Sequence, residues 1–584
     1  MDSQSNVTTS DNELVRQIFS QEPHVSPEEA QELLINSVCL RDGQQAERYS
    51  PTVDESMEYA LALVRFGVQG IEAGNAPAGD TENNKVIAIA EQVGGMILPN
   101  KSQYGVHPRI TSLARLFHED VVTALQAVQG APNRGVHTYM AHSEIQFPYK
   151  FNGLREIYGI SSADYDEFLQ KVVFPTIERE LKYIKDTDPE CQIRYSPEDW
   201  TRTRPDVAIA IVLHAAKCGA DTINVPDTVG VGNPFIMQMG IAQMRKALDE
   251  NGFGHVQLAF HGHNDGGMAA GNTLGAILGG AREVDVTQLG TGERGGNTSI
   301  ESVIFMLDTQ RAHIERVLGI RLTDTIVREE TMHMAQTAST IFRRPIPEDT
   351  PIVGKRQRQQ RAGVHQAAHA AGEEDGVATV YCPVDLKKYG VQTEYVIGPE
   401  SGKGGLRQVL KHMCLPFREA DMTKFARRMK QVCDSHRSDL EQPEVAEYIY
   451  SPIAIEITGG NHITEVKACE PIDGKIAVSI KTKDDKTYTG VASTKKEGEI
   501  DAIMQGMKHI IENNIDITRD GFHTRTTGEG SDADAISTFT MHRNGREVTQ
   551  SATDTNTHLA ERKALIQTFN ALWAQERYAE IAQE

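Results

Sequence analysis

The chain has 584 residues, with 59 lysines and arginines against 81 aspartates and glutamates, so its formal net charge is −22. That length predicts two to four domains rather than one hydrophobic core. The acidic balance disfavours non-specific binding to nucleic acid, and the lack of a run of about 18 apolar residues predicts no membrane span. Seven scattered cysteines without a CxxC pair and a polar N-terminus without a signal peptide favour a reducing, cytoplasmic location.

Between residues 34 and 300, short apolar runs alternate with helix-like segments such as DESMEYALALVRFG and RPDVAIAIVLHAAKCG. This alternation predicts parallel βαβ units. The runs that we interpret as strands are Leu34–Leu40, Val68–Ala73, Met96–Pro99, Val136–Ala141, Gln192–Tyr195, Thr222–Val225, Val256–Phe260 and Val284–Leu289. Eight units favour a (β/α)8 barrel over a doubly wound open sheet, because polar residues also cluster consistently after the strands.

The rest of the chain has a different pattern. Residues 311–445 are charged and helix-like, as expected of an accessory region. Further on, SPIAIEITGG, HITEVKAC, KIAVSIKTK and KTYTGVAST are strand-like, and a hairpin is expected with its turn at Asn544–Gly545. We therefore expect an N-terminal extension (1–33), a TIM-barrel catalytic domain (34–310), helical accessory and linker subdomains (311–445) and a C-terminal α+β regulatory domain (446–584).

Polar residues after the expected strands form the strongest functional signal. His261 and His263 follow an apolar run, and alternate residues of a strand share one face. An isolated HxH is also typical of an ordinary polar strand end. In a closed barrel, however, strand one adjoins strand eight and strand eight adjoins strand seven, so Asp42 and Asn297 can converge on the histidines. Two imidazoles, a carboxylate and a carbonyl oxygen suit Mg²⁺, Mn²⁺ or Zn²⁺ with positions open for substrate or water.

Two glycine-rich stretches imitate nucleotide-binding motifs. GTGERG (290–295) follows the last expected barrel strand, but the chain then leaves for the accessory region, which disfavours a nicotinamide site. GPESGKGG (398–405) has three residues where a phosphate loop has four and a glycine where it has Ser or Thr, which disfavours an NTPase. In the first stretch, Gly292 and Gly295 could still offer backbone N–H groups to a ligand phosphate.

The motifs LRDGQQ, YSPED, INVPDTVG, HGHND and GTGERGGN, and then AGVHQ, VYCPVD and SGKGG, resemble signatures of the isopropylmalate synthase/homocitrate synthase family. The resemblance runs in order over roughly residues 35–580. It implies a metal-dependent condensation of acetyl-CoA with a 2-oxo acid, first of all 2-oxoisovalerate, that yields a 2-alkylmalate and CoA. It further implies a homodimer, an amino-acid effector at the C-terminal domain, a divalent metal (Mg²⁺, Mn²⁺ or Zn²⁺) and K⁺ as a candidate second ion.

Carried over residue by residue, the resemblance implies that Asp42, His261 and His263 bind the metal. Asn297 would be a nearby or fourth ligand. Arg41 would stabilise the negative charge that grows on the keto oxygen, and Thr228 would bind the substrate carboxylate. The remaining implied contacts are Gln45, His137, Arg194, Ser196 and Asn224 for the 2-oxo acid, and Glu198, His365 and Tyr381 for proton transfer. Which of the last three is the base stays open.

Several alternatives remain at this stage. Arg194 stands where many isopropylmalate synthases have an acid and homocitrate synthases often have an arginine for the distal carboxylate of 2-oxoglutarate. QAERYSP after the first motif is also unusual, so phenylpyruvate and 2-oxoglutarate are alternative substrates. Arg41 and Asp42 could be a structural ion pair, and His365 and Tyr381 could be ordinary packed or surface residues. A metal-dependent aldolase or lyase, and a non-catalytic amino-acid sensor that uses GEGSDADAIS and SATDTNTH, are the other classes.

Overall fold

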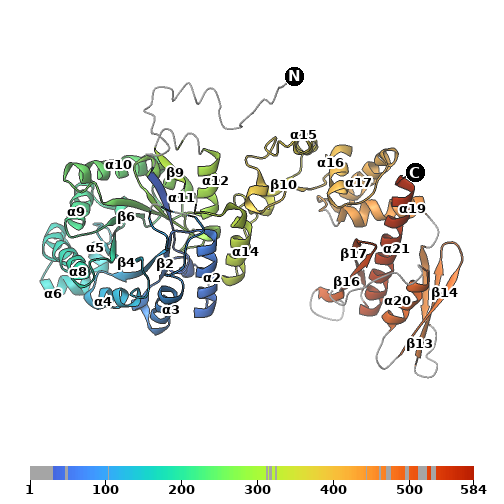
Figure 1. The fold of residues 1–584 in the computed structure, drawn as a ribbon, viewed down its shortest axis with the longest axis horizontal. Helices are drawn as coiled ribbons and strands as arrows, with labels where there is room; N and C mark the ends of the chain where they lie inside the picture. Colours follow the sequence, from blue (N-terminus) through green and yellow to red (C-terminus); the bar gives the residue numbers. More distant parts are fainter. Residues whose placement is uncertain are drawn as a thin grey trace, which may run out of the picture. The chain divides into compact units, whose positions relative to one another are not determined.

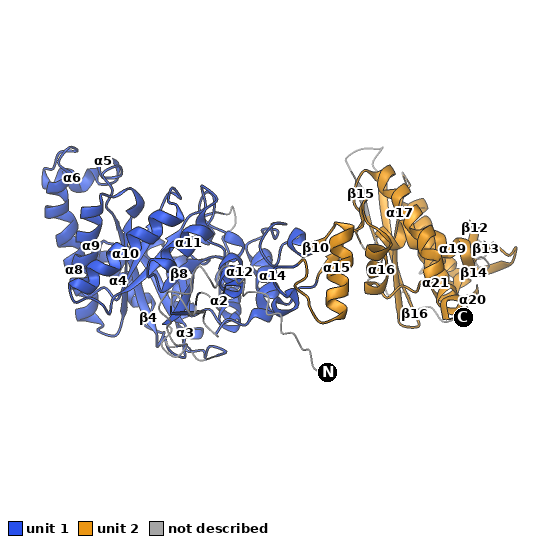
Figure 2. Cartoon of the chain, turned by 90° about the horizontal axis from the view of Figure 1, so that it is seen from above, with its two compact units in different colours: residues 1–358, 382–392 blue, residues 359–381, 393–584 orange. Residues whose placement is uncertain are grey.

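The computed structural model describes residues 31–46, 50–100, 102, 104–310, 314, 319–322, 325–441, 444–458, 462–468, 475–493, 499–510, 522–527, 534–554 and 556–583. The chain forms two compact units (Figures 1 and 2). Unit 1 comprises residues 1–358 and 382–392, and unit 2 comprises residues 359–381 and 393–584. The four-part division expected from the sequence is finer than these two units and stays a prediction.

Unit 1 contains a closed parallel barrel, which confirms the expected fold class. Its strands are β1 (Gln31–Ser37), β2 (Gly70–Gly74), β3 (Arg109–Arg115), β4 (Arg134–Ala141), β5 (Gln192–Glu198), β6 (Thr222–Asp227), β7 (Gln257–Gly262) and β8 (Glu283–Val286). Neighbours in sequence pair in parallel from β2 to β8, and β1 pairs with both β8 and β2, so the sheet closes. A short ninth strand, β9 (Ile320–Leu322), extends β1 on the outside of this ring.

Helices cover the barrel. They are α2 (Val53–Phe66), α3 (Asp80–Gln92), α4 (His118–Ala127), α8 (Phe174–Thr187), α9 (Pro205–Lys217), α10 (Pro234–Glu250), α11 (Ala269–Leu278), α12 (Ile300–Thr309) and α14 (Thr331–Ile341). The short helices α5 (Phe147–Lys150), α6 (Asn152–Tyr158) and α7 (Tyr165–Phe168) lengthen the connection between β4 and α8. Local sequence sets several ends: Thr52 and Glu55 form a capping box on α2, and Asn233 caps α10 just before Pro234.

The expected third strand at Met96–Pro99 was wrong. That run lies in an irregular connection, and β3 is formed by Arg109–Arg115 instead. The segment RITSLAR was not recognised as a strand, because it begins with an arginine although almost all of its residues are buried. The charge is tolerated there because Arg109 Nη1 and Nη2 bind Glu283 of β8 at 3.2 and 2.5 Å inside the barrel.

Unit 2 begins with helices and continues into two antiparallel sheets. Its elements are β10 (Gln359–Gln360), α15 (Gly363–Glu374), β11 (Glu394–Tyr395), α16 (Lys403–His412), α17 (Met422–His436), α19 (Ser451–Thr458), β12 (Ile463–Ala468), β13 (Lys475–Thr482), β14 (Thr487–Ser493), α20 (Glu499–Ile510), β15 (Phe522–Thr527), β16 (Asp534–Arg543), β17 (Arg546–Asp554) and α21 (Thr557–Gln583). One sheet has the order β12-β13-β14 and the other β15-β16-β17. Helix α20 packs on β13 and β14, and α21 packs on β16 and β17.

Two expectations for unit 2 have different outcomes. The hairpin turn at Asn544–Gly545 is confirmed, since both residues have positive φ (50° and 75°) between β16 and β17. The expected strand SPIAIEITGG was wrong, because Ser451–Thr458 is helix α19, where Ile453 and Ala454 are buried in a mainly helical core. Tertiary packing outweighs β-branched propensity there. The expected effector segments lie partly outside the described residues. No helix in the described ranges is long and apolar enough to span a membrane.

Candidate active site

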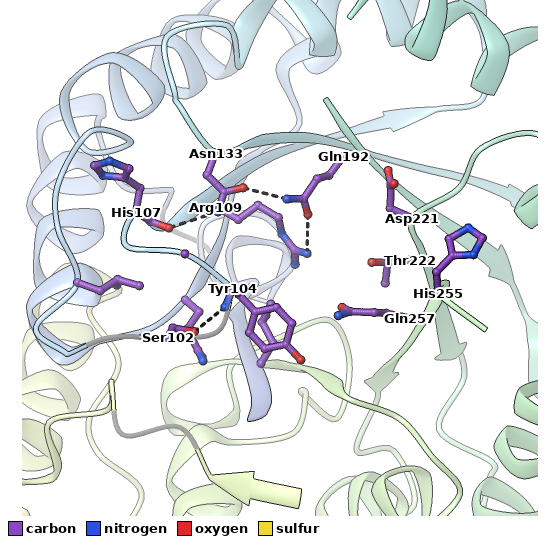
Figure 3. Close-up of a pocket in the computed structure, with 14 residues that line it drawn as sticks. Ser102, Tyr104, His107, Arg109, Asn133, Gln192, Asp221, Thr222, His255 and Gln257 are labelled. Carbon is purple, nitrogen blue, oxygen red and sulfur yellow. Dashed lines mark hydrogen bonds between the residues drawn. The ribbon is translucent and has the colours of Figure 1, made fainter. Parts of the chain in front are cut away.

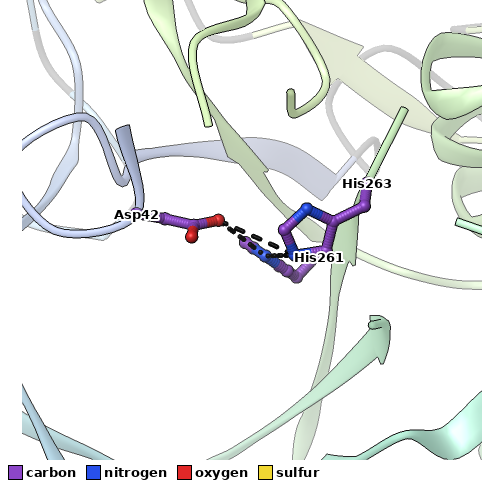
Figure 4. Close-up of side chains that lie close together, drawn as sticks. All are labelled: Asp42, His261 and His263. Atoms are coloured by element: carbon purple, nitrogen blue, oxygen red, sulfur yellow. Dashed lines mark hydrogen bonds and ion pairs between the residues drawn. The ribbon is translucent and has the colours of Figure 1, made fainter. Parts of the chain in front are cut away.

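The carboxyl ends of β1 and β7, which flank β8 in the barrel, bring three predicted metal ligands together (Figure 4). Asp42 follows β1, His261 lies on β7 and His263 just beyond it, and all three are buried. Asp42 Oδ2 lies 3.2 Å from His261 Nε2 and 3.8 Å from His263 Nε2, and the two Nε2 atoms are 3.3 Å apart. One ligand atom from each residue therefore fits within 4.8 Å of the others, which is a spacing that could hold one metal ion.

The surroundings of this cluster fit a divalent cation. Asp285 Oδ2 lies 3.1 Å from His261 Nδ1, so the Nδ1–H donates to that carboxylate and the Nε2 atom is directed toward Asp42. Asn297, which pairs with His263 through an isolated bridge, donates its amide N–H to Asp42 Oδ2 at 2.8 Å. Its amide oxygen is buried without a hydrogen-bond donor among the described residues. A carboxylate, two imidazoles and this oxygen are a donor set for Mg²⁺, Mn²⁺ or Zn²⁺.

Electrostatics at the cluster favour positive charge. Burial alone would raise the pKa of Asp42, but Arg41 and then His261 outweigh it and hold that pKa well below its usual range. Burial would lower the pKa of His261, but hydrogen bonds to Asp285 and Asp42 raise it to about 9. Burial and the neighbouring His261 lower the pKa of His263 to about 4. Asp42 and Asp285 thus stabilise a proton on His261. A metal cation would compete with that proton for the lone pair of Nε2.

Arg41 is fixed beside the cluster by two carboxylates. Its Nη1 lies 3.3 Å from Asp42 Oδ1, and its Nε donates to Glu72 of β2. The other Glu72 oxygen accepts from His137 Nδ1 at 2.5 Å, and His137 Nε2 lies 2.7 Å from Ser196 Oγ. Sequence reasoning missed Glu72, although an acid inside the apolar run Val68–Ala73 is a signal that could have identified it.

Arg194 lies beneath the pocket and does not line it. It is 2% exposed and donates through Nη2 to Asp285 Oδ1 at 2.6 Å, with Glu283 Oε1 3.3 Å from its Nε. Glu72 Oε2 is 3.8 Å from its Nη1. Burial would lower the pKa of Arg194, but these carboxylates outweigh it and raise it. Sequence reasoning did not identify partners for Asp285 and Glu283, because those partners come from distant strands.

A cavity of about 550 Å³ opens over the cluster. Of the predicted site residues, the cavity is lined by Arg41, Asp42, Gln45, His137, Ser196, Glu198, Asn224, Thr228, His261 and His263. Asn224 donates to Ser196 Oγ at 2.9 Å. Leu113, Tyr139 and Pro226 add apolar surface to the lining. Lys150 of α5 is a lining residue that sequence reasoning missed, and it donates to Glu198 Oε1 at 2.6 Å.

The predicted glycines pack closely in the loop after β8. A Cβ on Gly292 would lie 2.5 Å from Asn297 Nδ2, and one on Gly295 would lie 2.8 Å from the backbone of Asp265. Both glycines therefore have a packing reason besides the predicted contact with a cofactor phosphate. His365 and Tyr381 belong to unit 2, where their rings stack with centroids 4.1 Å apart.

A second cavity, of about 360 Å³, lies at the opposite, amino-terminal ends of the strands (Figure 3). Two of its polar groups are paired: Gln192 donates to Asn133 at 3.0 Å, and Arg109 donates to Glu283, which lies inside the barrel. Among the described residues, the Asp42 cluster is the one group with metal-ligand spacing. Since the working end of a parallel barrel is the carboxyl end, the cavity over that cluster is the candidate active site.

Comparisons with known proteins agree with this geometry. The HMGL-like family profile matches residues 32–325, and that of the LeuA allosteric (dimerisation) domain matches residues 462–573. The 2-isopropylmalate synthase of Prochlorococcus marinus is 29% identical over 92% of this chain and 95% of its own length. The 2-isopropylmalate synthases of Pyrococcus furiosus (28%; 86% and 92%) and Nostoc sp. (27%; 93% and 97%) are similar over comparable spans. The chain therefore belongs to the HMGL-like family and also carries a match to the LeuA allosteric (dimerisation) domain.

Proposed function

We propose that this enzyme condenses acetyl-CoA with a 2-oxo acid that has an uncharged side chain, first of all 2-oxoisovalerate. Water then cleaves the thioester, which yields a 2-alkylmalate and CoA. The observation that carries the proposal is the Asp42, His261 and His263 cluster beside Arg41 under an open cavity. The name 2-isopropylmalate synthase, borne by relatives that match nearly the whole chain, supports the same reaction.

Asp42, His261 and His263 would hold a divalent cation, with Asn297 as a further ligand. When bound, this cation would polarise the keto group of the 2-oxo acid as a Lewis acid. Arg41 would stabilise the negative charge that develops on the keto oxygen, and Glu72 and Asp42 hold its guanidinium in place before the substrate arrives. Thr228 would donate to the substrate carboxylate.

A thioester α-C–H is weakly acidic, so a positioned base is required. Glu198 ends β5 and lines the cavity, and we propose that it accepts the methyl proton or activates the hydrolytic water. Its pairing with Lys150 keeps the carboxylate within the cavity wall. His365 and Tyr381 remain predictions for the same proton transfer. Gly292 and Gly295 remain predictions for contact with the CoA phosphates, and K⁺ for a second ion.

The buried charges argue against 2-oxoglutarate as the substrate. Arg194 would have to leave Asp285 and Glu283 to bind a distal carboxylate, and those two acids would then be buried without it. Ser196 Oγ binds both His137 Nε2 and Asn224 Nδ2 in the cavity wall. The lining cations Arg41 and Lys150 are already paired with Glu72 and Glu198. A neutral side chain needs no additional cation. The match to the LeuA domain supports a homodimer with an amino-acid effector.

Thiol release from acetyl-CoA, followed with a thiol reagent in the presence of Mn²⁺ or Mg²⁺, tests the proposal. We expect 2-oxoisovalerate to give the highest kcat/KM among 2-oxoisovalerate, pyruvate, phenylpyruvate and 2-oxoglutarate. Asp42→Asn should lose thiol release and bind Mn²⁺ at least ten-fold more weakly by calorimetry. A wild-type protein that releases no thiol with any of the four acids refutes the proposal. Cleavage of an alkylmalate without CoA would instead indicate a lyase.

A further inference from the structure

Asp199, which directly follows the proposed base Glu198, has an unusual backbone conformation. Its φ is 66° and its ψ is 34°, in the left-handed region, and its side chain is fully buried. Non-glycine residues seldom adopt this conformation, although aspartate tolerates it better than most. Such a conformation persists where the surroundings hold it, and it is concentrated at functional sites.

Side-chain contacts hold Asp199 in this conformation. Arg202 Nε and Nη2 each donate to the Asp199 carboxylate at 2.8 Å, and Ser143 Oγ donates to the same group. The Asp199 carbonyl accepts from Thr203 Oγ1 at 3.0 Å. Ser143 follows β4, whereas Arg202 and Thr203 follow β5, so the carboxylate joins two connecting segments at the carboxyl end of the barrel.

Both polar groups of the peptide unit between Glu198 and Asp199 are hydrogen-bonded. Its carbonyl, that of Glu198, accepts from the N–H of His142 at 3.2 Å. Its N–H, that of Asp199, donates to Thr228 Oγ1 at 2.9 Å across to the end of β6. Because the side chain and carbonyl of Asp199 are anchored, its φ sets the orientation of this peptide plane and so the direction of the N–H.

This hydrogen bond decides how the Thr228 hydroxyl is used. Since Thr228 Oγ1 accepts from Asp199, the hydroxyl hydrogen must point toward another acceptor. Arg294 Nη2 donates to the Thr228 carbonyl at 2.7 Å, so the backbone of Thr228 is held as well. Thr228 lines the candidate active site, where the proposed substrate offers a carboxylate.

We propose that Asp199 is a positioning residue whose left-handed backbone directs its N–H onto Thr228, so that the Thr228 hydroxyl donates to the carboxylate of the 2-oxo acid. The inference rests on the proposed function and deepens it. The same peptide sets the direction of Glu198, so Asp199 links the group that binds the carboxylate to the proposed base.

Substitutions at Asp199 test the inference in the full-length, metal-loaded enzyme. Alanine removes the anchors and disfavours positive φ, so Asp199→Ala should raise the KM for 2-oxoisovalerate at least ten-fold and leave the KM for acetyl-CoA within two-fold. Asparagine tolerates the left-handed region and keeps a side-chain oxygen, so Asp199→Asn should stay within about three-fold of the wild type. Asp485→Ala is the matched control, because Asp485 has a φ of 65° in the turn between β13 and β14 of unit 2.

The decisive measurement is a double-mutant cycle with Thr228→Val. Once the hydroxyl is gone, Asp199→Ala should change the KM for 2-oxoisovalerate less than two-fold further. An undiminished ten-fold effect in that background, or equal KM values for Asp199→Ala and Asp199→Asn, overturns the inference. If Asp199→Ala does not fold, Asp199→Gly replaces it in the cycle, since glycine keeps positive φ without the anchors. Thiol release by the wild type is measured first, and its absence refutes the proposed function instead.

Discussion

At the scale of single residues, the candidate site depends on charges that are buried in matched sets. Arg194, Asp285 and Glu283 lie under the cavity, where a guanidinium binds two carboxylates from β8. A buried ion pair adds little net stability, but the loss of one partner leaves an uncompensated charge in a low-dielectric interior. The same carboxylate of Asp285 also orients His261. Substitution of Arg194 therefore shows whether this residue stabilises the fold or binds the substrate.

Arg194→Met should destabilise unit 1 by about 3–5 kcal/mol, because Asp285 and Glu283 lose their shared counter-ion. It should not change the order of preference among 2-oxo acids. Urea unfolding followed by tryptophan fluorescence measures the loss, in a Trp573→Phe background that leaves Trp200 in the barrel as the sole tryptophan. Arg204→Met is the control and should change little, because Arg204 is half-buried and its carboxylate partners Glu144, Asp166 and Asp206 are exposed. Unchanged stability with loss of turnover of 2-oxoglutarate alone would make Arg194 a substrate ligand.

Asp285→Asn should weaken Mn²⁺ binding by about 10–100-fold, because the carboxylate that accepts from His261 Nδ1–H and so leaves Nε2 for the metal is lost. Calorimetric titration of the metal-free protein with Mn²⁺ measures the dissociation constant. Asp265→Asn, which removes the charge of a carboxylate paired with Arg294, is the control and should leave Mn²⁺ binding within two-fold. Equal affinities for Asp285→Asn and the wild type would contradict the proposed metal site.

At the scale of elements, the turn after β8 shows how a strained segment is stabilised. Leu289 lies in the 3-10 turn Gln288–Gly290 with a φ of 58°, a rare conformation for a leucine. Both carboxylate oxygens of Glu301, on α12, accept from the Leu289 N–H at 3.1 Å. Burial raises the pKa of Glu301 to about 7, although its hydrogen bonds act in the opposite direction. Helix α12 thus holds the turn that leads to Asn297.

Glu301 should make unit 1 less stable as the pH rises. The folded pKa of about 7 exceeds the ordinary 4.5, so the folded state binds more protons between these values, and its stability falls through that window. Glu301→Gln stays neutral at all pH values. Its free energy of unfolding, relative to that of the wild type, should therefore rise by ~3 kcal/mol between pH 4.5 and pH 8. Urea unfolding at several pH values measures the difference. Glu58→Gln, on the exposed face of α2, should show no such trend, and a constant difference for Glu301→Gln would contradict the assignment.

At the scale of the whole molecule, the proposed metal site and the proposed dimerisation domain belong to different units. The residues that line the cavity over the metal cluster belong to unit 1, and the match to the LeuA dimerisation domain lies in unit 2. Within unit 2, α20 approaches β14 so closely that a Cβ on Gly490 would lie 1.9 Å from the Ala502 carbonyl oxygen. The sheet and helix of this region therefore pack only around a glycine.

Gly490→Ala should disrupt the packing of α20 on its sheet and reduce the dimer at micromolar concentration, as measured by sedimentation against a chain mass of 64.4 kDa. Mn²⁺ affinity should stay within two-fold, because the metal cluster lies in unit 1. Gly402→Ala, whose Cβ would meet nothing within 4 Å, is the matched control. A wild-type protein that sediments as a monomer would refute the proposed homodimer.

The sequence by itself determined the barrel, the strand ends that carry Asp42, His261 and His263, and the Asn544–Gly545 hairpin. These features follow from local periodicity, from turn chemistry and from the rule that parallel strands share one carboxyl edge. Only the tertiary structure decided that Arg109–Arg115 is the third strand, that Ser451–Thr458 is helical, and that Arg194 is paired beneath the cavity. In each case the deciding partner is distant in sequence. Packing against that partner outweighs local propensity in Ser451–Thr458, and carboxylates from β8 supply the counter-charges that Arg109 and Arg194 require.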